Sequence, residues 1–590
     1  MFKNDIHLRS ELTEIVDVYT SDGNFITQGE LNIRPNKAPV LELKNAYNTG
    51  NIDSAVFKAC SYNGIWYMLL DCSVYKFGRI YPKIIVKSDS HSGEFKTIKF
   101  VTQGLSQWFD NSKFLDFGDD YITKYLNTNK FMISVSDKSF GEIAISSENL
   151  WRTGGEKDGL FTISQKTAIC IEAKDSSFSC ESALDYIHRI NNLLSILIGY
   201  SLTIEYCFDV QEKRKNSIYF VNIQENDKKF ENQVECLVHE NYLFSENRWN
   251  TVFKSAFETN KSNFFDIWSR LPGLSNFSKY WEYELLACVS LTDRYSSKFS
   301  DENDEKIPDR KFSNIKKNLK EEVRKYTLES APGSLKQSVI DSIVEQIKVI
   351  KNTKYPSFQS RFECAYNSMS EDFRNIIRLS DEDFRHLKKL RDKIAHGDTP
   401  ETKFDGSLTH EATLQNKLLV ILYCWALKDF GIPESDCIKF LSNWMHPMIR
   451  SASLDKTALD KKIGRYRFIP LNKRDFVSAE KVKSGTLALE YSGKGKKYKY
   501  RKDLEQVMND WYIPQTDKPQ NLEEYLTLHL GTDSVHSLCY VGSVYIENGD
   551  QSHCTQGVCI LNPPNDLIDK NRFWEYDTNA NKWHQPLKDK

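Results

Sequence analysis

Residues 380–400 read "SDEDFRHLKKLRDKIAHGDTP", and this stretch predicts a helix with well-defined ends. Ser380, followed three residues later by Asp383, has the pattern of a capping box at a helix N-terminus. Apolar residues then recur at steps of three or four, which places them on one side of a helix: Phe384, Leu387, Leu390 and Ile394. We therefore expect the helix to begin after Ser380 and to pack this apolar stripe against a helical core.

The other end of this helix is equally well marked. Basic residues crowd its later turns, where the negative end of the helix dipole favours them. Gly397 can adopt the left-handed conformation that terminates a helix, and Pro400 prevents the helix from continuing. The helix is therefore expected to end at His396, which places an arginine, Arg391, and a histidine near one helix end.

Arg391 and His396 are the residue types that phosphate chemistry requires. A guanidinium holds a phosphate through two parallel charge-assisted hydrogen bonds, and histidine exchanges protons near neutral pH. Attack of a ribose 2′-OH on the neighbouring phosphate uses both functions and needs no metal. However, five residues rotate the helix by about 500°, so the two side chains lie roughly 140° apart around its axis. They converge only if the last turn unwinds at His396-Gly397, or if a second subunit supplies the partner groups.

The spacing is weak evidence by itself, because arginine and histidine at this separation also occur by chance in a chain of this composition. The alternative interpretation is a histidine at a helix C-terminus beside a solvated basic surface. The wider sequence has to distinguish these interpretations.

The chain divides into three regions of different periodicity, which predicts a multidomain α+β protein. Residues 1–250 contain short β-branched and aromatic segments separated by turn residues, as in an antiparallel sandwich or barrel. One helix interrupts them after Ser179. Residues 275–450 show helical periodicity with Gly/Pro breaks, which predicts an all-α bundle. Residues 451–590 mix basic, aromatic and turn-rich sequence and predict a small α+β domain.

The predicted strands and helices are named by their ranges. The strands of the first region are expected at 65–72, 81–89, 130–137, 167–175 and 217–224. The helices of the bundle are expected near 280–299, 309–327, 334–353, 358–378, 380–396, 411–430 and 434–450. In the last region, strands are expected at 487–493 and 536–550.

The motif Arg-Asp-Lys-Ile-Ala-His at 391–396, at the end of a basic helix in an all-α bundle, resembles the Arg-polar-x-x-x-His motif of the HEPN superfamily. The helix at 280–298 is similar to the long first helix of that fold. The β region, with "GLSQWF" at 104–109, resembles the domain that is paired with HEPN in ApeA-type anti-phage defence proteins. The resemblance covers roughly residues 1–450.

The resemblance implies a metal-independent endoribonuclease, without a cofactor, that acts as a homodimer or higher oligomer and is activated on infection. Arg391 would contact the scissile phosphate, His396 would be the general acid/base, and Asp392 would orient the site or contact RNA. Lys389 and Lys393 would add RNA contacts. Related defence enzymes cut RNA, often tRNA, to halt infection. Because a large non-catalytic part flanks the short catalytic bundle, we also expect a phage product, such as a phage protein, to trigger the activity, with the N-terminal β domain as the expected sensor and the C-terminal domain as the alternative. The alternative is a non-enzymatic HEPN module that binds RNA or protein.

This sequence departs from the family pattern at one position. Many relatives carry a glutamate after a leucine late in the first long helix, whereas this chain has Leu291-Thr292-Asp293. Glu284 and Asp293 are both candidates for the supporting acid, and the sequence does not choose between them.

The segment "GKGKKYKYRK" at 493–502 interleaves basic residues with tyrosines. Such segments can bind backbone phosphates and stack on bases, which makes Lys496, Lys497, Tyr498 and Lys499 candidates for RNA contact. The alternation of lysine and tyrosine equally suits a strand with one solvated charged face.

Soft-metal ligand types gather near the C-terminus, at His536, Cys539, His553, Cys554 and Cys559. Their spacing fits no standard zinc module, so buried thiols in a strand pair are the expected alternative and no metal is assigned.

The overall composition points to a cytoplasmic protein. A net charge of −2 provides no global basic surface, so RNA contacts must come from local patches. The thirteen cysteines contain no CxxC pair and are expected to be reduced. No apolar segment is long enough to span a membrane, and no phosphate-loop, nucleophile-elbow or metalloprotease motif is present.

Overall fold

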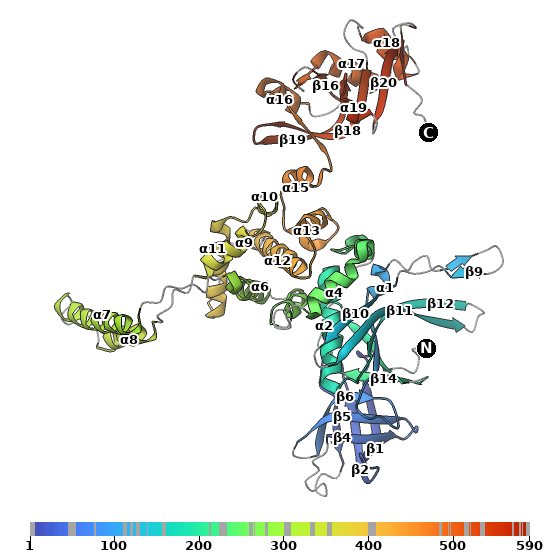
Figure 1. Cartoon of the computed structure of the whole chain (residues 1–590), viewed down its shortest axis with the longest axis vertical. Helices are drawn as coiled ribbons and strands as arrows, with labels where there is room; N and C mark the ends of the chain where they lie inside the picture. Colours follow the sequence, from blue (N-terminus) through green and yellow to red (C-terminus); the bar gives the residue numbers. More distant parts are fainter. Residues whose placement is uncertain are drawn as a thin grey trace. The chain divides into compact units, whose positions relative to one another are not determined.

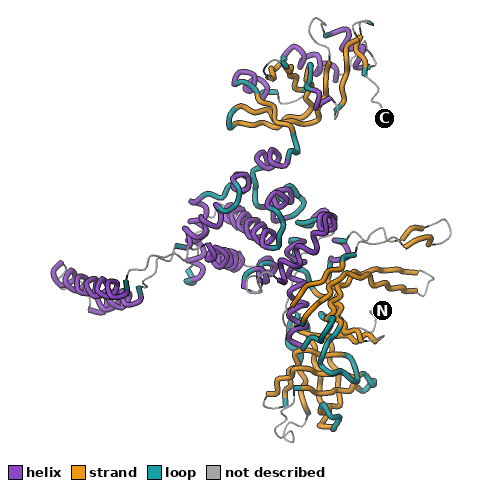
Figure 2. The backbone as a smooth tube through the Cα atoms, viewed as in Figure 1, coloured by secondary structure: helices purple, strands orange, loops and turns teal. Residues whose placement is uncertain are grey.

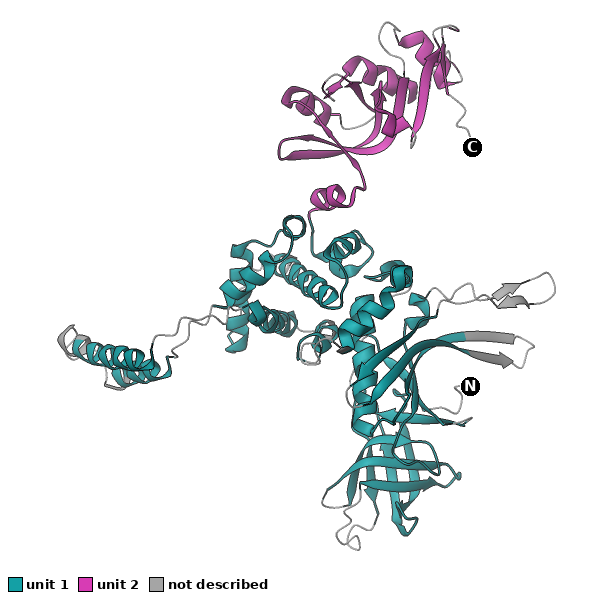
Figure 3. Ribbon diagram, viewed as in Figure 1, with its two compact units in different colours: residues 1–454 teal, residues 455–590 magenta. Residues whose placement is uncertain are grey.

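The computed structural model shows two compact units, residues 1–454 and 455–590 (Figure 3). Both are built from helices and strands (Figure 2), so the multidomain α+β class predicted from the sequence is confirmed. The structure describes all residues except 1–5, 45–54, 76–77, 110–114, 118–121, 126–129, 138–139, 156–160, 212–213, 223–232, 259–263, 265, 278–280, 300–307, 331–336, 351–356, 399–408, 483–485, 494, 496, 513–518, 520, 531–536, 569–570, 578–579, 581 and 586–590.

The N-terminal region of unit 1 is built on an antiparallel sheet of twelve strands within the described residues. These strands are β1 (Leu12–Thr20), β2 (Phe25–Ile33), β3 (Val40–Leu43), β4 (Val56–Ser61), β5 (Trp66–Tyr75), β6 (Arg79–Val86), β7 (Thr97–Thr102), β10 (Met132–Asp137), β11 (Gly141–Gly155), β12 (Phe161–Ala173), β13 (Ile204–Gln211) and β14 (Arg214–Phe220). β8 (Leu115–Phe117) and β9 (Ile122–Tyr125) form a separate pair.

The sheet closes on itself at one end and stays open at the other. β6 pairs with both β3 and β5, which closes strands β1 to β6 into a barrel. From β6 the sheet continues through β14, β13, β7, β12 and β11 to β10 (Figure 1). The predicted β region therefore combines a barrel with an open sheet. The two share β6, which pairs with β3 and β5 in the barrel and with β14 in the open sheet.

The helix predicted after Ser179 is α2 (Cys180–Ile198). The Ser179 hydroxyl caps it by accepting the Ser182 N–H. Its apolar side is buried and is formed by residues that recur at steps of three or four: Ala183, Ile187, Ile190, Leu194 and Leu197. Gly199, in the left-handed conformation, ends the helix.

The "GLSQWF" segment at 104–109 is part of the core. Its short helix, α1 (Leu105–Trp108), follows Gly104, which has a φ of 85°. Trp108 is fully buried and its indole N–H donates to the Val238 carbonyl at 2.8 Å. The segment thus ties the sheet to the chain that follows it.

Short helices lead from the sheet into the helical region. They are η3 (Gln233–Glu235), α3 (Glu240–Phe244), η4 (Ser245–Asn247), α4 (Arg248–Glu258), η5 (Trp268–Arg270) and η6 (Pro272–Phe277). The helical region itself contains α6 (Trp281–Ser296), η7 (Ser297–Phe299), α7 (Asp309–Ser330), α8 (Gln337–Val349), α9 (Phe358–Asn367), α10 (Glu371–Ile377), α11 (Asp381–Ala395), α12 (Thr409–Asp429), α13 (Glu434–Phe440) and α14 (Pro447–Ser451).

Two of the predicted helices are each divided in the structure. The segment at 358–378 forms α9 and α10, because the Ser370 side chain caps a new helix by accepting the Phe373 N–H. The segment at 434–450 forms α13 and α14, which are separated by a turn at 441–446. Asn443 in that turn donates to the Cys236 carbonyl at 2.7 Å, so its side chain serves a tertiary contact rather than a continuous helix.

Polar contacts join the β-rich and helical regions of unit 1. Asp436 in α13 accepts hydrogen bonds from Tyr242 at 2.9 Å and from Arg248 at 2.7 Å. The Trp268 indole donates to Asp429, at the end of α12, at 2.8 Å. Separating these groups would leave buried polar atoms without partners, which costs free energy. The two regions are therefore held together by specific contacts.

His446 is a second element of this junction. It precedes α14 and is buried beside the end of α2, where its ring packs on Tyr200 at a centroid distance of 5.1 Å. Gly199 makes room for it, since a Cβ at that position would lie 2.3 Å from the imidazole Nε2. Burial lowers the pKa of His446 to about 4, and the Gly199 backbone offsets this only in part.

We expect mild acidification to destabilise the folded protein through His446. In the unfolded chain this imidazole binds a proton below about pH 6.5, whereas the folded state keeps it neutral down to a pKa of about 4. Because the unfolded state binds more protons in this window, the free energy of unfolding should fall by about 2 kcal/mol between pH 7 and pH 5 and level off below pH 4. Urea unfolding of the wild type and of His446→Gln measures this loss, which the variant should lack. The exposed His410→Gln is the control, and an equal pH dependence in all three proteins would contradict the assignment.

Unit 2 has a sheet of seven strands among its described residues, with helices against it (Figure 2). Its elements are α15 (Lys456–Ile463), β15 (Arg467–Pro470), α16 (Lys473–Glu480), β16 (Leu487–Ser492), β17 (Lys497–Tyr500), α17 (Lys502–Tyr512), α18 (Leu522–His529), β18 (Ser537–Asn548), β19 (Gln551–Leu561), α19 (Asn565–Ile568), β20 (Arg572–Asp577) and β21 (Lys582–His584). Separate apolar cores cover the two faces of the sheet.

Across the described residues of both units, the helices are too short or too polar to cross a membrane.

Candidate active site

The helix α11 has the ends that the sequence predicts. The Ser380 hydroxyl accepts the Asp383 N–H at 3.1 Å and the Asp383 carboxylate accepts the Ser380 N–H at 3.1 Å, which completes the capping box. At the other end, the Asp398 N–H reaches the Lys393 carbonyl and the Gly397 N–H reaches the Ile394 carbonyl. Together with the φ of 79° at Gly397, these bonds form a Schellman motif that stops the helix at His396.

One side of α11 packs into the helical core. Phe384, Leu387 and Leu390 are buried, and the Phe384 ring stacks on Phe362 of α9 at 3.6 Å between centroids. Ile394, the last residue of the predicted stripe, is only half-buried. The core contacts of α11 therefore end one turn before the helix does, and its last turn carries the candidate residues.

Arg391 lies on this last part of α11 and faces two carboxylates. Its Nη1 donates to Asp392 Oδ1 at 2.7 Å. Its Nη2 lies 3.5 Å from Asp293 Oδ2 on α6. The Arg391 and Asp293 side chains remain 26% and 29% exposed, so a ligand can reach them from solvent. The guanidinium is thus held in place at the surface.

Asp293 also binds a second arginine. Arg361, in the first turn of α9, donates to Asp293 Oδ1, and its side chain is 17% exposed. One carboxylate from α6 therefore lies between two guanidinium groups from α9 and α11. Of the two acids left open by the sequence, Asp293 is the one that contacts Arg391, because Glu284 precedes it on the same helix by nine residues, or about 13 Å.

His396 is the exposed cap of the same helix. The last turn does not unwind before it, since its backbone N–H still reaches the carbonyls of Asp392 and Lys393 at 3.1 Å. Regular geometry up to Ala395 keeps Arg391 and His396 on different sides of α11, and no described contact of this chain joins them. The imidazole is open to solvent, whereas the guanidinium is turned toward α6.

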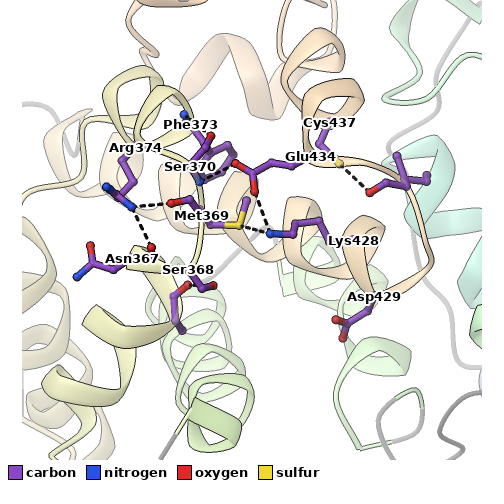
Figure 4. A network of polar contacts seen from close by, with 12 residues as sticks. Asn367, Ser368, Met369, Ser370, Phe373, Arg374, Lys428, Asp429, Glu434 and Cys437 are labelled. Atoms are coloured by element: carbon purple, nitrogen blue, oxygen red, sulfur yellow. Dashed lines mark hydrogen bonds and ion pairs between the residues drawn. The ribbon is translucent and has the colours of Figure 1, made fainter.

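A network of polar contacts holds the α9–α10 turn against α12 and α13 (Figure 4). Glu434 accepts the Ser370 N–H at 2.8 Å and the Lys428 ammonium at 2.9 Å. Burial alone would raise the pKa of Glu434, but the hydrogen bonds from Ser370 and Lys428 outweigh it and lower the pKa. Arg374 adds a bond to the Asn367 carbonyl at 3.0 Å. The network fixes the C-terminal end of α9, the helix that carries Arg361.

Residues 286–436, which span α6 to the start of α13, match the family model of the Apea-like HEPN domain. This part of the chain is an ApeA-like HEPN domain. This match confirms the resemblance inferred from the Arg-Asp-x-x-x-His motif, and it includes Asp293, Arg361, Arg391 and His396. The domain indicates a nuclease or RNA-related role in defence. No curated protein and no solved structure matches the chain significantly.

The sequence did not single out Arg361, and it left Asp293 as one of two candidates. Arg361 is separated from Arg391 by 30 residues, and no short motif links them. The sequence did hold one indication in favour of Asp293, namely its position in the last turn of the first long helix of the HEPN domain. Only the packing of α6 against α9 and α11 selects it.

The lysines predicted to contact RNA on α11 lie at or near the surface. Lys389 is exposed and Lys393 is half-buried. Both lie close to Arg391 in the chain, so they stay in the proposed RNA surface of the HEPN domain.

In unit 2 the basic segment forms β17, with alternating side chains. Lys497 and Lys499 are exposed, whereas Tyr498 is buried in the core and accepts a hydrogen bond from Arg467 at 3.3 Å. A ring in this position has no free face for a base, so Tyr498 is removed from the candidate RNA contacts. This pattern is the strand with one charged face that the sequence offered as an alternative. Lys496 lies outside the described residues.

The cysteines and histidines of unit 2 do not gather into a metal site where the structure describes them. Cys559 pairs with Tyr540 across the β18–β19 ladder, which places Cys559 and Cys539 on opposite faces of the sheet. Each is buried in a different apolar core, whereas Cys554 is exposed and His553 lies opposite Ile546. His536 lies outside the described residues. Among the described residues, no three metal-binding side chains come together.

Proposed function

We propose that this protein is a metal-independent endoribonuclease of an anti-phage, abortive-infection type, with tRNA as its substrate. The observation that carries the proposal is that Arg391 and His396 both lie on the last turns of one helix of a HEPN domain. Arg391 is accessible at the surface and held by carboxylates, and His396 is exposed. Asp392 and Asp293 act as positioning residues for the guanidinium.

The proposed reaction is an internal transfer at phosphorus. The His396 imidazole takes the proton of a ribose 2′-OH, whose oxygen forms a bond to the adjacent phosphorus. The bond from phosphorus to the 5′-oxygen of the next nucleotide breaks, and that oxygen takes the proton from the His396 imidazolium, which returns the histidine to its neutral form. The products are a 2′,3′-cyclic phosphate and a 5′-hydroxyl. Arg391 stabilises the extra negative charge that the phosphorane carries.

A site of this kind requires two copies of the chain. Arg391 and His396 point to different sides of α11, so a single regular helix cannot place both on one phosphate. Two α11 helices that meet across a twofold axis would bring the arginine of one subunit to the histidine of the other. The half-buried Ile394 on the last turn suits such a contact. We therefore propose a homodimer or higher homo-oligomer.

The test of the proposed function is cleavage of total tRNA by the purified protein in EDTA. Defined fragments that end in a 2′,3′-cyclic phosphate support the reaction. If the protein binds tRNA but cleaves none, with or without extract from infected cells, the non-enzymatic RNA-binding module is the better description.

We expect Asp293→Asn to slow cleavage by about tenfold, because the amide no longer neutralises Arg361 and Arg391 and holds their guanidiniums less firmly. The effect should fall on kcat more than on KM, and Asp293→Glu should restore part of the rate. Asp266→Asn is the matched control. Asp266 pairs at 3.2 Å with Arg294, an exposed arginine that follows Asp293 on α6. An Asp293→Asn enzyme with the wild-type kcat would remove Asp293 from the site.

We further propose that the β-rich region regulates the ribonuclease and that a phage product triggers it. The contacts from Arg248 and Tyr242 to Asp436, and from Trp268 to Asp429, provide a physical route between the two regions. Full-length protein should leave the growth of uninfected cells unchanged and cleave tRNA on infection. Growth arrest of uninfected cells by the full-length protein would contradict this regulation.

A further inference from the structure

The helices α7 and α8 form an antiparallel pair inserted between two helices of the site (Figure 1). The Lys316 ammonium, near the start of α7, donates to the Lys348 carbonyl, near the end of α8, at 2.9 Å. Ile340, Val344 and Ile347 of α8 are buried against α7. These contacts half-bury one side of α7, which carries Phe312, Lys316, Lys320 and Val323, and leave its other described side chains exposed.

The exposed side of α7 is basic. Residues 309–325 contain seven basic and three acidic side chains, whereas the net charge of the whole chain is −2. Arg310, Lys317 and Arg324 follow each other at intervals of seven residues, close to two helical turns, so they lie in one row. Lys320 lies beside this row. We call these four residues the α7 basic stripe; it runs for about 21 Å along the helix.

Three of the four stripe side chains are not neutralised by carboxylates of the described chain. Lys325 pairs with Glu322 at 3.6 Å, but neither lies in the row. No described carboxylate is within ion-pair distance of Arg310, Lys317 or Lys320. Arg310 and Lys317 are exposed and Lys320 is half-buried. Glu321 also lies in this row, four residues after Lys317 and three before Arg324, so the row carries three positive charges and one negative charge. Its net positive charge favours a polyanionic ligand.

Chain connectivity ties the pair to the candidate active site at both ends. Asp293 lies on α6, seven residues before the start of segment 300–307, which leads to α7. α9, which follows the pair, carries Arg361 in its first turn. Full extension of the eight connecting residues spans only about 30 Å. The stripe therefore stays within reach of an RNA whose scissile phosphate lies at Arg391.

From these observations we infer that the α7 basic stripe binds the phosphate backbone of the RNA substrate, outside the cleavage site. The inference rests on the proposed ribonuclease function. Lysine and arginine at regular spacing contact phosphates without reading bases, so the stripe contributes affinity that is independent of sequence and sensitive to salt. Exposed apolar residues on another side of the pair, including Ile315 and Leu319, make a protein partner the competing outcome.

The test is tRNA binding by the full-length His396→Ala protein, which leaves the RNA intact. The triple substitution Arg310→Gln, Lys317→Gln and Lys320→Gln removes three charges and keeps residues of high helix propensity. We expect about tenfold weaker binding near 0.1 M salt, and a dependence of log K on log[salt] that is less steep by about 2 to 3. Different tRNAs should be affected equally. The matched control, Lys37→Gln, Lys44→Gln and Lys96→Gln, removes three exposed charges from the β-rich region.

Each outcome decides the inference separately from the ribonuclease activity. If the α7 triple variant binds tRNA like the control variant, the inference is wrong; a simultaneous change in oligomeric state would reassign the stripe to a protein contact. If the wild type cleaves no RNA but tRNA binding depends on the stripe, the ribonuclease proposal fails and the stripe stands.

Discussion

His396→Ala and Arg391→Ala should each reduce tRNA cleavage by about 10²- to 10⁴-fold, whereas tRNA binding should change far less. Loss of a general base costs about this much, and loss of one group that stabilises developing charge costs about 10²- to 10³-fold. The structure favours a catalytic rather than a structural effect for His396. Its side chain is exposed, and the cap of α11 is made by backbone groups and Gly397.

The controls use the same residue types in similar settings. Arg385→Ala removes an exposed arginine from α11 whose Nε donates only to the Asp381 carbonyl among the contacts of the described chain. His410→Ala removes an exposed histidine at the start of α12. Initial rates of tRNA cleavage in EDTA measure the effect, and melting temperatures exclude unfolding. Cleavage at the wild-type rate by either alanine variant would reject the site.

Mixing the two inactive variants should restore cleavage to about a quarter of the wild-type rate. In a heterodimer of Arg391→Ala and His396→Ala, one composite site has lost both groups, and the other keeps the arginine of one subunit and the histidine of its partner. Random assortment makes half of the dimers heterodimers, each with one of its two sites intact. The expected rise over either variant alone is therefore on the order of 100-fold.

Co-expression with two affinity tags isolates the heterodimer and makes the comparison direct. A mixture of Arg391→Ala with the double variant is the control and should stay inactive, because no site in it contains an intact arginine. If the isolated heterodimer is also inactive, both groups act from the same chain, and the arrangement of α11 across a twofold axis is wrong.

Local sequence signals predicted the helices of the bundle and a minority of the strands. The strands expected at 65–72, 81–89, 130–137, 167–175 and 217–224 are β5, β6, β10, β12 and β14. Closure of the barrel was left open, because it depends on β6 pairing with β5 as well as with β3, and no residue pattern within one strand encodes a second partner. The division of the predicted helix at 434–450 likewise followed from a tertiary contact, that of Asn443 with Cys236. The division at 358–378 followed from the local cap at Ser370, which the sequence analysis did not identify.

The ends of α11 and the family assignment were determined by the sequence alone. The Ser380–Asp383 capping box, the Gly397 terminus and the Arg-Asp-x-x-x-His motif involve groups only a few residues apart, so their geometry follows from helix periodicity and local hydrogen bonding.

Only the tertiary structure decided which groups surround Arg391. Asp293 and Arg361 lie 98 and 30 residues before it in the chain, and they meet because α6, α9 and α11 pack on a shared apolar core. Tyr498 shows the same limit, since alternation in β17 predicted that lysines and tyrosines face opposite sides but not that Tyr498 is enclosed in the core. Burial and ion pairing depend on contacts between distant segments, which sequence periodicity does not specify.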